Sequence, residues 1–156
     1  MKKVISLFLM CVILCVSSIT VYADENVQER YQLREENFEV AEEDTPNFAP
    51  YTRYLIDIQT TIARLDAGKV GIRAHAYCSS VMKNINYTFY LQKKSGSSWS
   101  TVATTTASAA NVSDAARSVT ATGVSSGTYR GKVTVRVTDN YGYSESLTGY
   151  SGSISI

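Results

Sequence analysis

The sequence is poor in the residues on which most catalytic and metal sites depend. Its 156 residues include one histidine, three cysteines, two prolines and one tryptophan. A zinc site needs several His, Cys or carboxylate ligands together, and the one histidine, His75, has no nucleophile-elbow motif beside it. No glycine-rich phosphate-binding loop occurs either. These absences argue against an enzyme, and we expect no metal and no cofactor.

The chain also has only one long apolar run, which excludes a protein that crosses a membrane several times. The run covers residues 4–16, follows Lys2 and Lys3, and precedes a small-residue site that ends at Ala23. This layout is typical of a secretory signal peptide, and the run is too short to span a bilayer comfortably. We predict a signal peptide over residues 1–23 and a secreted or envelope-associated protein; a retained N-terminal anchor is the alternative.

The formal net charge of +1 conceals two segments of opposite charge. Residues 24–50 hold nine acidic side chains against two arginines, whereas residues 51–156 hold eleven basic against five acidic. Val27, Tyr31 and Phe38 fall loosely on one helical face, so we predict an acidic linker that is mostly disordered or forms a short helix. A basic module can bind its own acidic tail in a salt-dependent way. The alternative interpretation of residues 24–50 is therefore an electrostatic latch that binds to the basic module.

Apolar and polar side chains alternate with period two throughout residues 51–156, as expected for half-buried strands. The clearest case is residues 129–138, in which Tyr129, Val133 and Val135 are predicted to face inward. Turns rich in Gly, Asn, Asp and Ser separate the runs, and no stretch keeps a helical period. We predict an all-β domain of about seven strands, near residues 54–64, 69–78, 84–94, 99–106, 115–122, 128–138 and 143–155.

This number of short strands in roughly 100 residues predicts an immunoglobulin-like β-sandwich, with a small β-barrel as the alternative. Tyr129 follows a Ser-Ser-Gly turn, which is where such sandwiches place a corner tyrosine. The last strand moves its apolar residues from the face of Leu147 to that of Tyr150 and Ile154. We therefore predict a β-bulge near Gly149.

Residues 96–102 (Gly-Ser-Ser-Trp-Ser-Thr-Val) and 127–135 (Gly-Thr-Tyr-Arg-Gly-Lys-Val-Thr-Val) resemble fibronectin type III or immunoglobulin-like modules. The similarity extends roughly over residues 51–156 and is closest to small secreted Gram-positive proteins of unknown function. These are built as a signal peptide, a short acidic lead and one sandwich. The resemblance implies a fold and an extracellular address, and it brings no catalytic residues.

Cys78 is the one cysteine outside the predicted signal peptide, so the disulfide of antibody-type domains cannot form. We predict that Cys78 is a small buried apolar residue at the end of an inward row. The alternative is a reactive thiol, or one that joins two copies, which would need exposure at the strand's end.

Binding is the function that we predict. In an immunoglobulin-like topology the third, sixth and seventh strands are neighbours, and their outward faces are basic, hydroxyl-rich and partly aromatic. Such a face suits an anionic envelope polymer or a protein partner; alternatively, it is a solvated face that protects against aggregation. Nucleic acid is not expected without an aromatic stacking platform. The predicted binding face consists of Tyr90, Lys93, Lys94, Arg130, Lys132 and Arg136.

A second candidate is the turn that follows the sixth strand. Loops at the end of a sandwich often carry recognition, and tyrosines beside a glycine are typical of adaptable binding loops; the alternative is a plain hairpin turn. Two other functions stay open, a structural or assembly protein of the cell surface and a secreted inhibitor. The predicted loop residues are Asp139, Asn140, Tyr141 and Tyr143.

Overall fold

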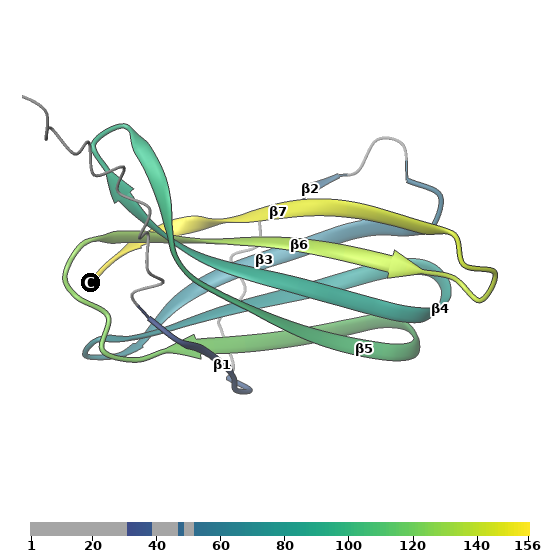
Figure 1. The fold of residues 1–156 in the computed structure, drawn as a ribbon, viewed down its shortest axis with the longest axis horizontal. Helices are drawn as coiled ribbons and strands as arrows, with labels where there is room; N and C mark the ends of the chain where they lie inside the picture. The colour runs from purple at the N-terminus through teal and green to yellow at the C-terminus, as the bar shows by residue number, and fades with distance from the viewer. Residues whose placement is uncertain (1–30, 39–46, 49–51) are drawn as a thin grey trace, which may run out of the picture.

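The computed structural model describes residues 31–38, 47–48 and 52–156, and this part of the chain is all-β (Figure 1). The signal-peptide prediction falls outside these residues. Every strand pair is antiparallel. The strands are β1 (Leu33–Glu35), β2 (Asn47–Phe48), β3 (Leu55–Asp66), β4 (Lys69–Ser95), β5 (Ser98–Ala121), β6 (Thr128–Thr138) and β7 (Ser144–Ser155).

Two strands are much longer than predicted, because each joins two of the predicted strands. β4 runs through the predicted strands 69–78 and 84–94, and β5 runs through 99–106 and 115–122. The register of this pair shifts between Tyr77 and Met82, and nearby Asn111 adopts a left-handed φ of 57°. The irregularity divides each strand into two halves that pair with different neighbours.

The halves of β4 and β5 belong to two layers. In the first layer the order is β2, β3, the first half of β4, the second half of β5, and β1. In the second layer the order is the first half of β5, the second half of β4, β6 and β7. This is an immunoglobulin-like arrangement in which the fourth predicted strand pairs with the third rather than the fifth. The barrel alternative is wrong, because in the described chain β7 pairs only with β6 and the sheet stays open.

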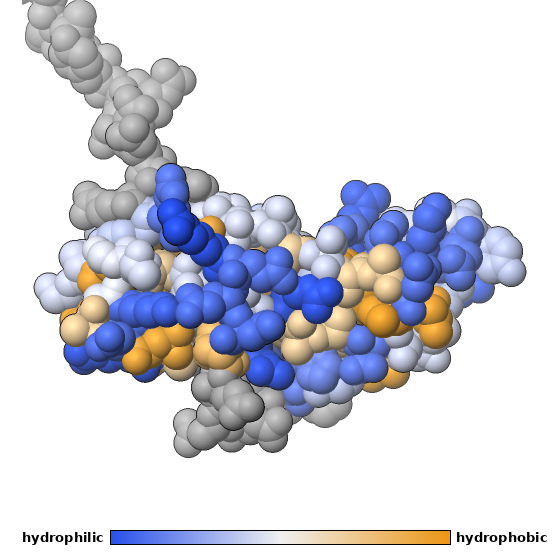
Figure 2. Space-filling view, turned by 90° about the horizontal axis from the view of Figure 1, so that it is seen from below, coloured by the Kyte–Doolittle hydropathy of each residue, from blue (hydrophilic) through white to orange (hydrophobic). Residues whose placement is uncertain are grey.

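The core lies between the layers and contains the inward rows that the alternation predicts. Fully buried side chains come from β3, β4, β5 and β6, and they include two aromatic residues that stack, Tyr87 and Phe89. The layers approach closely where Gly131 of β6 faces Ile72 of β4. The space-filling view shows a largely hydrophilic face whose apolar residues form separate patches (Figure 2). The predicted inward residues Tyr129, Val133 and Val135 are confirmed as buried, and the same alternation buries Val70, Ile72, Ala74, Ala76, Ile85, Tyr87, Phe89, Leu91 and Val137.

Replacing Gly131 with alanine is expected to lower the free energy of unfolding by about 2 kcal/mol, the usual cost of overpacking a tight core. The added Cβ would lie 2.8 Å from the Ile72 methyl carbon. The matched control is Gly152→Ala, since no atom lies within 4 Å of a Cβ there. It should stay within about 0.5 kcal/mol of the unmodified protein. Urea unfolding measures both, and equal stability of the two variants would contradict the close approach.

The predicted bulge exists, but it lies after Tyr150 rather than near Gly149. Lys132 pairs with Tyr150, and Arg130 pairs with Ser153. The extra residue therefore falls at 151–152, opposite Gly131. As a consequence Tyr150 faces outward and is 40% exposed, whereas the prediction grouped it with Ile154.

The corner tyrosine is confirmed. The hydroxyl of Tyr129 donates a hydrogen bond to the backbone carbonyl of Ser125, four residues upstream, at 2.9 Å. This is the bond by which sandwiches of this type fix the connection into the sixth predicted strand. The Ser125 hydroxyl also lies 2.8 Å from that of Tyr31, so the corner contacts the N-terminal segment.

Residues 31–38, which we call the strap, pack on the sandwich. The sequence predicted that they belong to a mostly disordered linker or a short helix. β1 pairs with the end of β5, and Tyr31 and Leu33 are buried. The reason is that these two residues alternate with exposed Gln32 in period two. β2, also inside the predicted linker, pairs with β3; the rest of residues 24–50 lies outside the described chain.

Carboxylates hold the strap in place. Glu36 accepts hydrogen bonds from the Lys69 ammonium at 2.8 Å and the Thr120 hydroxyl at 2.7 Å, and these bonds lower its pKa. Glu35 lies 3.5 Å from the Arg117 guanidinium. Two carboxylates of the strap thus contact basic side chains of the sandwich, and the electrostatic latch stays a prediction.

Candidate functional site

The candidate site is the outer face of the second layer, which we call the aromatic–cation face. It is formed by the outward residues of β6 and those beside them on β4, β5 and β7. Lys132 pairs with Tyr90 on one side and Tyr150 on the other. In the same way Arg136 lies between Asn86 and Ser146. Strand register therefore brings cations of β6 beside rings and hydroxyls of its neighbours.

Arg130 is held between two aromatic rings. Its guanidinium lies 4.5 Å from the centre of the Trp99 ring and 4.7 Å from that of Tyr150. Its Nε donates a hydrogen bond at 2.8 Å to the amide oxygen of Gln92, a buried residue of β4. Cation–π contacts and a fixed acceptor restrict the rotamers of the side chain. The prediction included Arg130 but missed Trp99 and Tyr150.

Lys132 makes a similar contact one step along the same face. Its ammonium lies 5.0 Å from the centre of the Tyr90 ring. Next in line, the hydroxyls of Thr134 and Thr148 lie 3.0 Å apart, and Arg136 beyond them is exposed. The outward row of β6 thus contains both cations and hydroxyls.

The two predicted lysines at the end of β4, Lys93 and Lys94, point to opposite faces of the strand. Lys94 pairs with Trp99 and is exposed. Lys93 continues the inward row of Leu91, and its ammonium donates to the Ser125 hydroxyl and the Ser126 carbonyl, both at 3.0 Å. Because side chains alternate along a strand, Lys93 belongs to the corner beneath the face, not to the face itself.

The strands that form the aromatic–cation face contribute no outward carboxylate to it. In residues 82–112, 128–138 and 144–155 the one acidic side chain is Glu145, and it pairs with buried Val137 on the inward side. The other acids of the sandwich lie elsewhere; Asp114, for example, contacts His75 at 3.2 Å. The strands of the face therefore add no negative charge to it, and the acidic side chain at its β4–β5 side is Glu35 of the strap, which lines a hollow with Asn86 and Thr88.

The predicted binding loop is shaped by Asp139. This carboxylate accepts hydrogen bonds from the backbone N–H groups of Tyr141 at 2.8 Å and Tyr143 at 2.9 Å. Burial would raise the pKa of Asp139, but these hydrogen bonds outweigh it and the pKa is lowered. Asn140 is exposed and Tyr141 is 95% exposed. Asp139 therefore organises the loop, and the neighbouring side chains are presented to solvent.

Tyr143 joins a cluster at this end of the sandwich that the sequence did not predict. Its ring packs edge-on against Tyr54 at 6.0 Å, and the Arg53 guanidinium lies 5.0 Å from one ring centre and 5.7 Å from the other. Nearby, Glu145 accepts hydrogen bonds from the backbone N–H groups of Arg53, Tyr54 and Leu55 at 2.9, 2.7 and 2.5 Å. Glu145 thereby ties the start of β3 to β7.

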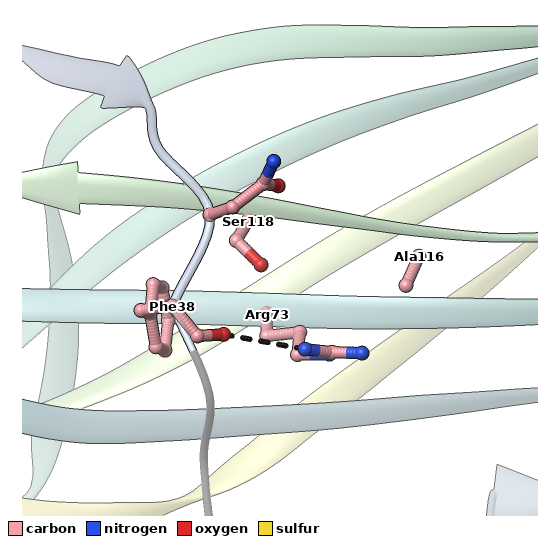
Figure 3. Close-up of a pocket in the computed structure, with 5 residues that line it drawn as sticks. Phe38, Arg73, Ala116 and Ser118 are labelled. Atoms are coloured by element: carbon pink, nitrogen blue, oxygen red, sulfur yellow. Dashed lines mark hydrogen bonds between the residues drawn. The ribbon is translucent and has the colours of Figure 1, made fainter.

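The outer face of the first layer carries a shallow hollow beside the strap. It has a volume of about 400 Å³ and is lined by Asn37, Phe38, Arg73, Ala116 and Ser118 (Figure 3). Arg73 donates a hydrogen bond to the Phe38 carbonyl at 3.2 Å, and Phe38 occupies the space above Gly71. The strap thus fills part of this face and lies on the opposite layer from Arg130 and Lys132.

The described residues also include the side chains that could bind a metal ion or react as a free thiol. None of their His, Cys, Asp and Glu side chains form a group of three or more that could hold a metal ion. Cys78 is free and half-buried, and burial raises its pKa to about 11. In the part of the chain that the structure covers, no helix has the length and apolar character needed to span a bilayer.

Comparison with known proteins adds no function. No model of a protein family matches the chain, and no curated protein matches its sequence. Among solved structures, the GAE domain of GGA2p from Saccharomyces cerevisiae is similar at 13% identity over 72% of this chain and 97% of that one, with a TM-score of 0.37. A similarity at this level does not show what this chain does. The assignment to immunoglobulin-like sandwiches depends on this chain's strand order and corner tyrosine.

Proposed function

We propose that the protein is an exported, non-enzymatic binding module that contacts a cell-envelope polymer or a protein partner through the aromatic–cation face. The observation that carries the proposal is that Arg130 and Lys132 lie over aromatic rings with no carboxylate among them. A cation restrained in this way loses less rotamer entropy when a ligand binds. The predicted signal peptide supports export.

The end cluster supports a second site, suited to a protein partner. Tyrosine and arginine are the usual anchors of protein interfaces, and Arg53 joins Tyr54 and Tyr143 here. Tyr143 is 46% exposed, and Tyr141 beside it is almost fully exposed. An assembly role through Cys78 is less favoured, since a raised pKa leaves little thiolate to form a disulfide.

Arg130→Gln is expected to weaken binding of the exported chain to purified anionic envelope polymer by about tenfold, which is about 1.4 kcal/mol. The matched control is Arg64→Gln, which removes the same charge from an exposed position on β3 and should change Kd by less than about twofold. Isothermal titration calorimetry gives both values. Equal loss in the two variants would remove the face from the proposal.

A further inference from the structure

The rings of the aromatic–cation face are engaged by cations. Neutral polysaccharides are bound largely by stacking sugar rings on aromatic faces, as other ring systems stack. Here Arg130 lies over the rings of Trp99 and Tyr150, and Lys132 lies over the ring of Tyr90. The arrangement orients the cations and leaves less ring surface for sugars. It therefore favours a charged ligand over a neutral one.

The donors of Arg130 suit an oxyanion. Its Nε is bonded to Gln92, while no hydrogen bond within the described chain uses the two terminal nitrogens. A guanidinium fixed in this way presents a planar pair of donors that matches phosphate or carboxylate oxygens. Lys132 presents an ammonium that forms no ion pair with any described residue.

The spacing along β6 suits a repeating ligand. Arg130 and Lys132 are two residues apart on one face, which is about 7 Å in a strand, and Arg136 lies about 14 Å beyond Lys132. Hydroxyls of Thr134 and Thr148 fill the interval. The face is the outer side of an open sheet, so a chain that lies along β6 can extend beyond either end of the strand.

We infer that the ligand is a linear polyol-phosphate polymer that lies along β6, with successive phosphates at Arg130 and Lys132. The inference rests on the proposed function and specifies its ligand. Six covalent bonds join successive phosphorus atoms through a three-carbon polyol, which spans roughly 7 Å when extended. The polymer has no sugar rings in its backbone, and its hydroxyls can bond to the threonines. Polyuronates carry similar charge on bulky rings that the occupied aromatic faces do not accommodate.

The test is titration of the exported chain with oligo(glycerol phosphate) of two and of six repeats, with oligogalacturonate of six repeats, and with a neutral glucan. We expect six glycerol-phosphate repeats to bind at least about fivefold more tightly than two, since a longer chain also reaches Arg136. They should also bind at least about fivefold more tightly than the uronate. Lys132→Gln should weaken this binding about fivefold. It should also reduce the slope of log affinity against log salt concentration by about one, because one fewer counterion is released, and Arg64→Gln should do neither.

The outcomes separate the inference from the proposed function. Equal affinity for uronate, or no dependence on length, overturns the polyol-phosphate assignment. If one of these results is obtained but Arg130→Gln still weakens binding of envelope polymer, the proposed function stands and only its ligand is wrong. If glycerol phosphate binds and neither Arg130→Gln nor Lys132→Gln weakens it, both fail. Arg130→Lys retains the charge and loses the planar donor pair, so retention of full affinity in that variant also overturns the placement of a phosphate at this residue.

Discussion

A chain that begins at residue 51 is expected to be less stable than one that begins at residue 24, by about 4 kcal/mol. The sequence places the start of the folded domain at residue 51, but Tyr31 and Leu33 are buried in the core. Burying an apolar or aromatic side chain of this size contributes about 2 kcal/mol. The shorter chain also lacks β2 and the contacts of Glu36 with Lys69 and Thr120. Urea unfolding at neutral pH measures the difference.

Point variants of the longer chain separate burial from chain length. The double variant Tyr31→Ala/Leu33→Ala should reproduce most of the loss, because it empties the same two core positions. Gln32→Ala/Arg34→Ala is the matched control, since both side chains are exposed within the same four residues, 31–34, and it should change stability by less than about 0.5 kcal/mol. Equal unfolding midpoints for the two chain lengths would show that the strap is dispensable.

Glu145→Ala is expected to lower the free energy of unfolding by about 3 kcal/mol. Three successive backbone N–H groups lose a charged acceptor, and hydrogen bonds to charged groups contribute about 1.5–3 kcal/mol each before water replaces part of the loss. Glu145→Gln retains one acceptor oxygen and should cost about half as much. Ser146→Ala, at the exposed neighbouring position, is the control. A Glu145→Ala variant as stable as that control would contradict the role of the carboxylate.

The same carboxylate makes stability depend on pH. Burial would raise the pKa of Glu145, but hydrogen bonds from the backbone of residues 53–55 outweigh it and lower the pKa. The pKa values of Asp139 and Glu36 are lowered too. A lowered pKa in the folded state means that the stability is fully present above the unfolded value, near 4, and is lost as pH falls through the folded value. Unfolding midpoints between pH 6 and pH 2 should fall less steeply in Glu145→Ala.

The strand pattern of the sandwich was predictable because one face of each strand is buried. Alternation alone assigns inward residues such as Val133 and Val135. It does not show where a strand passes from one layer to the other, so β4 and β5 were each predicted as two strands. The strap was missed because two buried residues, Tyr31 and Leu33, give too short a pattern among so many acidic side chains.

The candidate site was predictable only in part for the same physical reason. Parity along β6 places Arg130, Lys132 and Arg136 on the outer face, as predicted. Which rings they meet depends on register across strands. The register that starts at the turn after β6 continues unbroken to Tyr150 and brings it opposite Lys132, because the bulge comes after Tyr150. For Trp99, the signal was its place beside a hairpin turn, directly across from Lys94.

The passage of β4 and β5 through both layers has a mechanical consequence. Most sandwiches connect their layers by loops, which bend when the layers are pulled apart. Here two neighbouring strands carry continuous backbone from the outer face of one layer to the other. Tension applied along β6 would pass through the β4 ladder into the first layer, on which the strap packs. The two layers therefore share continuous backbone and are expected to unfold together.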